Sequence, residues 1–567
     1  MRSFIFILIS TVFLVAFKNG EKTYPTTDFR SPIDFPIKIS GTFAELRPNH
    51  FHGGLDIKPS KRNKQGDAII AIGEGYISRI LISAHGYGNA LYVTHPNGYT
   101  SVYAHLQKFT PRITEYAKNR QYANQSFEFD EMLDPAEFPV SKGDQIAHLG
   151  NTGGSLGAHL HFEIRDTRTE IAINPLYFGF NILDDRKPFL QQLKVYELNH
   201  NHETTNAKTY NIRNVDGQYQ VQPSILEIPS NQIAIGVKAY DNISGTSNAN
   251  GIFSMDIFRD DSLVYRFEME KVSYKETRYL NAHLDYGAWF NKKGYINRGY
   301  RLKGNHLGIY KYLANDGVIQ LSNSPSRIVV IIKDFKGNES TLSFQVKKAA
   351  TLNTLDGNIF NYIFPYNEAS IVQRSDLELY FPDSSFYENI YANIQIGNDR
   401  SDYIYSATYH IHDDKIPIHR NYQIKIKLQR PIEDSLKSKL YIGKCIKGKS
   451  RYIGNKWDGE WIVGEARSFG DYAILLDTIP PTITIRDFNG EKERSSRLGF
   501  KLSDKGTGIK TYNAWVDGEW ILMKYDGKRN MIYHEFDERI TEGKHELKVA
   551  VTDLSNNETT FKGIFIR

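Results

Sequence analysis

An internal repeat constrains the fold of this 567-residue chain more than any other feature. Three blocks occur twice in the same order: an acidic lead with proline before a strand-like run, then YDNISGT or SDKGTGI, then KDFKGNE or TDLSNNE. Within them, short runs of apolar residues alternate with turn residues, which is typical of antiparallel strands. We therefore predict two copies of one immunoglobulin-like β-sandwich, at residues 184–349 and 477–567. The first copy is enlarged by an insertion near residues 265–320.

The rest of the chain also reads as mainly β. Residues 67–106 are short apolar runs split by glycine turns, which predicts hairpins of an antiparallel sheet in an N-terminal domain at residues 21–183. A polar, partly helical insertion interrupts that domain at about residues 107–138. Residues 350–476 alternate strand-like runs and turns, so we predict a third β-sandwich of another kind. The aromatic share of 13% favours this β-rich architecture.

The first residues indicate export. Arg2 precedes an apolar run from Phe4 to Phe17 that is short for a membrane span. We predict a signal peptide at residues 1–20, with an uncleaved anchor as the alternative. This places the protein in the periplasm or cell envelope, or outside the cell, with no membrane contact beyond that segment. The net charge of +5 is too small to indicate a nucleic-acid partner.

The cysteine and histidine content narrows the chemistry. The single cysteine, Cys445, excludes an internal disulfide and a zinc site built mainly on thiolates. Any metal must therefore be held by histidine and carboxylate. Of 17 histidines, 8 fall between His50 and His161.

Three segments in this region carry the chemistry: HFHGGLDI at residues 50–57, YAHL at 103–106 and GGSLGAHLHFEI at 153–164. A catalytic zinc needs three nitrogen or oxygen ligands and an open position for water. The H-x-H spacing alone is weak evidence, because His410 and His412 repeat it without the glycines. We expect these two histidines to be ordinary polar residues of a strand. The joint order of all three segments is the stronger signal.

In that joint order the sequence resembles the M23 family of zinc metallopeptidases, the LytM or lysostaphin-like endopeptidases, over about residues 41–176. The resemblance implies that His52, Asp56 and His161 are ligands of Zn²⁺. It also implies that His105 and His159 are the catalytic pair. None of the five positions is missing.

The resemblance implies a zinc-dependent endopeptidase that hydrolyses peptide bonds of peptidoglycan by zinc-activated water. Because no HExxH motif is present, a histidine must handle the proton. One alternative is a cell-envelope binding or scaffold protein with an occluded M23 domain, whose β-sandwiches contact envelope proteins. Another is an endopeptidase that acts on a protein. The insertion at 107–138 could form a lid, inhibit the site or shape specificity.

Several further residues have two interpretations each. Glu163 shares a strand face with His161 and either supports that ligand or is structural. Tyr103 and His50 either line the cleft or are a strand and a loop residue. Within the predicted sandwiches, four aspartates brace loops, with calcium binding as the minor alternative: Asp241, Asp334, Asp504 and Asp553.

Overall fold

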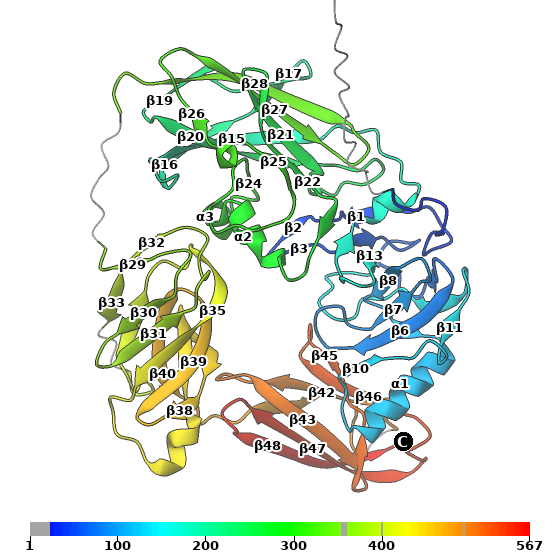
Figure 1. The fold of residues 1–567 in the computed structure, drawn as a ribbon. Helices are drawn as coiled ribbons and strands as arrows, with labels where there is room; N and C mark the ends of the chain where they lie inside the picture. Colours follow the sequence, from blue (N-terminus) through cyan, green and yellow to red (C-terminus); the bar gives the residue numbers. More distant parts are fainter. Residues whose placement is uncertain (1–22, 353–359, 398–400, 492–493) are drawn as a thin grey trace, which may run out of the picture.

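The computed structural model describes residues 23–352, 360–397, 401–491 and 494–567 (Figure 1). The predicted signal peptide lies outside these residues. An antiparallel N-terminal sheet is followed by three β-sandwich units, which confirms the predicted mainly-β fold class. In the part of the chain that the structure describes, no helix is long and apolar enough to cross a membrane.

The main sheet of the N-terminal domain carries the predicted site near one edge. Strand β13 (Leu160–Asp166) is buried along nearly its whole length. It lies between two neighbours, β4 (Leu55–Ile57) and β8 (Tyr99–Ala104), and is covered on both faces. A smaller sheet packs nearby with the order β5 (Ala68–Ile70), β12 (Gln145–His148) and β9 (Lys108–Phe109). The order in the main sheet is β1 (Ile39–Gly41), β4 (Leu55–Ile57), β13 (Leu160–Asp166), β8 (Tyr99–Ala104), β7 (Ala90–Thr94), β6 (Gly75–Ile82) and β10 (Phe129–Met132).

The insertion at 107–138 lies at the opposite edge of this sheet from the predicted ligands. It forms helix α1 (Pro111–Ala123), which begins with a proline, and strand β10, which pairs with β6. The helix contacts the C-terminal sandwich, beside which it is drawn in Figure 1. Lys118 Nζ lies 2.7 Å from Asp537 Oδ2, and the Tyr122 and Trp520 rings are 5.5 Å apart. The insertion therefore connects the first and last domains.

The two predicted repeat copies share one strand topology. In the first copy, β15 pairs with β20 in one sheet, and the other sheet has the order β28-β27-β21-β22. In the second copy, β41 pairs with β42, and the other sheet has the order β48-β47-β43-β44. The strands are β15 (Phe189–Leu198), β20 (Gln232–Tyr240), β21 (Ser254–Arg259), β22 (Ser262–Glu268), β27 (Ser326–Lys333), β28 (Glu339–Lys348), β41 (Thr482–Ile485), β42 (Arg497–Ser503), β43 (Ile509–Val516), β44 (Glu519–Ile521), β47 (Lys544–Asp553) and β48 (Glu558–Ile566).

The middle unit between the copies has a separate hydrophobic core and two five-stranded sheets. One sheet is β30 (Ser370–Gln373), β31 (Leu377–Phe381), β35 (Pro417–Lys427), β39 (Trp461–Ser468) and β38 (Lys456–Asp458). The other is β33 (Ile394–Gly397), β34 (Thr408–Ile411), β40 (Gly470–Leu476), β36 (Leu440–Ile446) and β37 (Lys449–Gly454).

The first sandwich is joined to the N-terminal domain by backbone pairing and by a common core. Strand β14 (Ala172–Ile173) pairs with β23 (Lys271–Val272) of the sandwich, with Ala172 opposite Val272. One cluster of buried apolar side chains runs through both units. Burial of apolar surface between them gives a fixed junction, so side chains of the sandwich can take part in the N-terminal site.

His283 of the first sandwich makes the stability of this junction pH-dependent. Its imidazole is fully buried, 4.9 Å from the Phe267 ring, and burial lowers its pKa to about 3. In the unfolded chain the pKa of this histidine is about 6.5. Below that pH the unfolded state therefore binds a proton that the folded state does not bind. Stability should therefore fall below that pH by about 1.4 kcal/mol per pH unit.

We expect His283→Phe, which cannot titrate, to flatten the dependence of the Tm on pH between neutral and mildly acidic conditions. Calorimetry at a series of pH values measures this slope. His200→Gln removes an exposed histidine of the same sandwich and should keep the wild-type slope. Equal slopes for His283→Phe and the wild type would contradict the expectation.

Candidate metal centre

The predicted ligands meet on two adjacent strands and the loop before them. Asp56 on β4 lies directly opposite His161 on β13, and His52 is in the loop between β3 (His50–Phe51) and β4. This loop approaches β13 closely through two glycines. A Cβ on Gly54 would lie 2.2 Å from the carbonyl oxygen of Phe162, so only glycine fits there.

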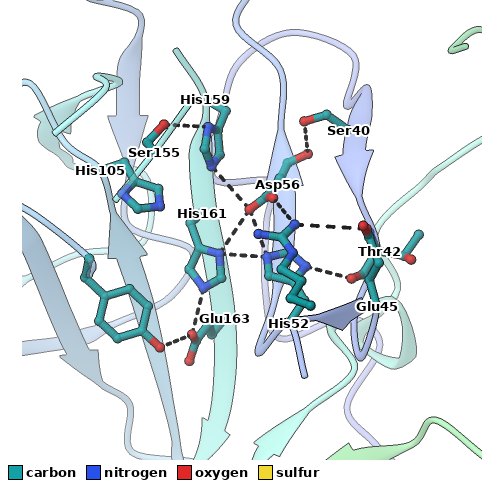
Figure 2. A network of polar contacts seen from close by, with 12 residues as sticks. Ser40, Thr42, Glu45, His52, Asp56, His105, Ser155, His159, His161 and Glu163 are labelled. Atoms are coloured by element: carbon teal, nitrogen blue, oxygen red, sulfur yellow. Dashed lines mark hydrogen bonds and ion pairs between the residues drawn. The ribbon is translucent and has the colours of Figure 1, made fainter. Parts of the chain in front are cut away.

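The free nitrogens of the two ligand histidines point at one carboxylate oxygen (Figure 2). His52 Nδ1 donates to the Thr42 carbonyl oxygen at 2.7 Å. His161 Nε2 donates to Glu163 Oε1 at 2.7 Å. The other nitrogens, His52 Nε2 and His161 Nδ1, lie 2.9 Å apart and 2.9 and 3.0 Å from Asp56 Oδ1.

With no metal bound, and despite burial, Asp56 and Glu163 raise the pKa of His161 to about 9, so its ring carries a proton toward Asp56. With both imidazoles neutral, as metal ligands must be, lone pairs on two nitrogens and one oxygen converge, which is unfavourable unless a cation lies among them. All three side chains are buried, with exposed fractions of 2% for His52, 6% for Asp56 and 5% for His161. Two imidazoles and a carboxylate are a donor set that suits a catalytic zinc ion. These residues therefore fit a metal, and together they form a group that could hold one.

The charges around the group favour an ionised aspartate. Without a metal, burial opposes ionisation of Asp56, but the charge of His52 and hydrogen bonds from protonated neighbouring imidazoles hold its pKa well below the usual value. Arg47 Nη2 binds the second carboxylate oxygen, Oδ2, at 2.6 Å. Burial lowers the pKa of His52 to about 4, so this imidazole is neutral and can act as a ligand near neutral pH.

The predicted catalytic histidines lie beside this group. His159 precedes β13, and its Nε2 is 3.3 Å from Asp56 Oδ1, buried and without a hydrogen-bond partner. The ring centroid of His105 is 4.8 Å from that of His159. His105 Nδ1 donates to the Thr152 carbonyl oxygen at 2.9 Å, which leaves its Nε2 as an acceptor. Burial and the neighbouring histidines lower the pKa of His105 to about 3.

The structure shows the surroundings of Glu163, Tyr103 and His50, which each had two interpretations. Glu163 is fully buried and binds His161 directly. Tyr103 is fully buried in the core, where its hydroxyl contacts Ser101 Oγ at 3.0 Å, and so does not line a cleft. His50 is exposed, but it lies on the short strand β3 rather than in a loop. The separate H-x-H residue His410 pairs with Asp471 on a strand of the middle unit.

A residue of the first sandwich completes the surroundings of His161. Tyr274 Oη donates to Glu163 Oε1 at 2.6 Å and lies 2.8 Å from Tyr87 Oη. Arg165 Nε holds the other oxygen of Glu163 at 2.7 Å. A carboxylate that orients a ligand histidine also raises its basicity, so Tyr274 would act on a metal bound here through Glu163.

Tyr274→Phe should weaken zinc binding about tenfold, the low end of the effect of residues that support metal ligands. The aromatic ring stays, and only the hydroxyl that binds Glu163 is lost. Competition with a zinc-sensitive dye measures the affinity. Tyr312→Phe removes an exposed hydroxyl of the same sandwich and should have no effect. Unchanged affinity in Tyr274→Phe would show that the hydroxyl does not support the site.

Comparison with known proteins identifies the family of the N-terminal domain. The model of peptidase family M23 matches residues 50–125, and a Zu5-like domain matches residues 361–477. The N-terminal part of this chain therefore contains a peptidase family M23 domain. The family resemblance predicted from the motifs is confirmed.

Curated relatives match over the same region. An uncharacterized metalloprotease of Haemophilus influenzae is 30% identical over 156 residues, which is 26% of each chain. The murein hydrolase activator NlpD of Escherichia coli is 33% identical over 22% of this chain and 25% of its own. The DD-carboxypeptidase/endopeptidase Mpg of Neisseria meningitidis is 32% identical over 20% of each chain. The chain thus spans about a quarter or less of the length of these relatives.

Solved structures that match part of this chain include the catalytic domain of lysostaphin from Staphylococcus simulans. It has 22% identity, covers 26% of this chain and 93% of its own, and has a TM-score of 0.20. The catalytic domain of a prophage-encoded M23 protein from Enterococcus faecalis has 20% identity, covers 26% and 92%, and has a TM-score of 0.19.

Proposed function

We propose that this protein is an exported zinc endopeptidase that hydrolyses peptide bonds of peptidoglycan. The observation that carries the proposal is the convergence of His52 Nε2, His161 Nδ1 and Asp56 Oδ1 within 3.0 Å, beside two further histidines. The match to peptidase family M23 supports the reaction class. The names of NlpD and Mpg, which refer to murein and to peptidase activity, support the substrate class.

In this proposal His52, Asp56 and His161 hold the zinc ion. When bound, zinc acts as a Lewis acid that lets water ionise near neutral pH and polarises a carbonyl. Hydrolysis also needs a base for the attacking water and an acid for the leaving nitrogen. His105 and His159 supply both proton-transfer positions, because each has one nitrogen fixed by a backbone carbonyl and the two rings lie side by side next to Asp56.

The remaining contacts keep this arrangement in place. The Thr42 carbonyl fixes the ring orientation of His52, and Glu163 does so for His161. Arg47 occupies the second oxygen of Asp56, so its first oxygen faces the histidines. Low exposure of these groups strengthens the electrostatic interactions among them.

The proposal is tested with purified sacculi that carry a covalent dye. The zinc-loaded chain alone should release soluble dye, a chelator should stop the release, and added zinc should restore it. Failure of the zinc-loaded chain to release dye would refute the proposal.

A second candidate is an envelope scaffold or an activator of another hydrolase, as the name of NlpD suggests. One contact links the C-terminal sandwich to the surroundings of the site. Lys528 of the C-terminal sandwich binds Asn151, with Nζ 2.9 Å from Oδ1, and the next residue, Thr152, holds His105. A scaffold or activator should still support the other hydrolase when His161 is replaced. A peptidase should lose its hydrolysis of peptidoglycan.

A further inference from the structure

Three carboxylates converge in the first sandwich, away from the metal centre described above. Asp184, Asp241 and Asp334 offer oxygens that all lie within 4.8 Å of one another. Asp184 precedes β15, Asp241 follows β20, and Asp334 follows β27. Asp241 and Asp334 are each only 3% exposed.

Hydrogen bonds fix two of these carboxylates. Asn338 donates to both oxygens of Asp334, from its backbone nitrogen at 2.9 Å and from Nδ2 at 2.7 Å. The backbone nitrogen of Ser244 donates to Asp184 Oδ1 at 3.0 Å. The third carboxylate differs, because Asp241 Oδ1 is buried without any hydrogen-bond partner. A buried, unpaired carboxylate oxygen is costly and indicates a missing ligand.

The electrostatics also favour a cation. Among the described residues, we find no ion pair between these aspartates and a lysine or arginine, although Lys336 lines the same cavity. Burial, followed by the charges of Asp184 and Asp334, raises the pKa of Asp241 to about 7. The carboxylates border a cavity of about 40 Å³, which has room for one ion or water molecule.

The second repeat copy has the same framework. Thr507 donates to Asp477 at 2.8 Å as Ser244 does to Asp184, and Asn557 Nδ2 donates to Asp553 Oδ2 at 2.7 Å. The counterpart of Asp241 is Asp504, whose Oδ1 is also buried and unpaired. Its Oδ2 accepts two backbone hydrogen bonds, from Gly506 and Gly508. The unpaired oxygen is therefore a feature of the repeat, but the close grouping of all three carboxylates is found in the first copy.

We propose that Asp184, Asp241 and Asp334 bind a calcium ion in the first sandwich. Calcium prefers carboxylate and carbonyl oxygens in flexible geometry, and this cluster offers oxygen ligands alone. The same cavity is lined by Thr42 of the M23 domain, whose carbonyl holds His52. Bound calcium would thus brace the junction next to the metal centre. The proposal does not depend on the proposed peptidase function.

The test measures calcium content and Tm of the purified chain, with calcium alone as the ligand. Calcium at about 100 times its Kd should raise the Tm of the wild type by about 5–11 °C. Asp241→Asn should bind one calcium fewer per chain and lose this rise. In calcium-free buffer its Tm should equal or exceed that of the wild type, because a repulsive charge is gone.

The matched control is Asp261→Asn, which removes an exposed carboxylate of the same sandwich and should keep the wild-type response. A wild type that neither binds calcium nor gains Tm would overturn the proposal. So would an Asp241→Asn variant with wild-type calcium content. A calcium-free Tm of Asp241→Asn below that of the wild type would also overturn it, because the aspartate would then stabilise the fold without an ion.

Discussion

His161→Ala is expected to remove both the bound zinc and the hydrolysis of peptidoglycan. The side chain supplies one of three converging donor atoms, and Glu163 fixes its orientation. Loss of a residue that only supports a ligand costs about 10–100-fold in affinity or activity. Loss of a ligand itself should therefore cost more than about 10³-fold in activity. Elemental analysis gives the zinc content, and dye release from sacculi gives the activity.

The matched control for this variant is His410→Ala. It also removes a histidine of an H-x-H pair, but its side chain is 52% exposed and pairs with Asp471 in the middle unit. It should keep one zinc per chain and full activity. If His161→Ala still bound zinc and released dye like the wild type, the metal centre would be assigned to the wrong residues.

His159→Ala should separate metal binding from catalysis. Its Nε2 is unpaired and faces Asp56, yet it lies outside the group of three ligand residues. The variant should therefore keep its zinc while hydrolysis falls by about 10²–10⁴-fold, the usual contribution of a general acid or base. His105→Ala should behave in the same way, because its free nitrogen lies beside His159.

His50→Ala is the control for this pair. His50 is exposed and lies two residues before a ligand, so its loss should change neither zinc content nor activity. If His159→Ala lost its zinc, His159 would be a ligand rather than a proton-transfer residue. If it kept full activity, His159 would have no role in the reaction.

The grouping of His52, Asp56 and His161 could be predicted from the sequence because the motifs fix local geometry. The H-x-H spacing puts two side chains on one face of a strand, and H-x-G-x-D belongs to the adjacent strand and loop. The register of β4 and β13 then places Asp56 opposite His161. The repeat was predictable for a similar reason, because alternating runs and turns determine strand order within each copy.

Contacts between distant segments could not be predicted in this way. Tyr274 lies 111 residues from Glu163 in the sequence and reaches it only because two domains share a core. Strand alternation places Tyr103 on the same face as His105, which is the basis of the interpretation that it lines the cleft. The backbone of His105 is left-handed, with φ of 60°, so the alternation ends before it and Tyr103 points into the core.

The central claim is that this chain hydrolyses peptidoglycan with water activated at the His52, Asp56 and His161 site. The most direct test is mass spectrometry of muropeptides after digestion of purified sacculi in water labelled with oxygen-18. The wild type should give new peptides with one labelled oxygen at each new carboxyl end, and His161→Ala should give none. Identical, unlabelled profiles for the two proteins would contradict the account.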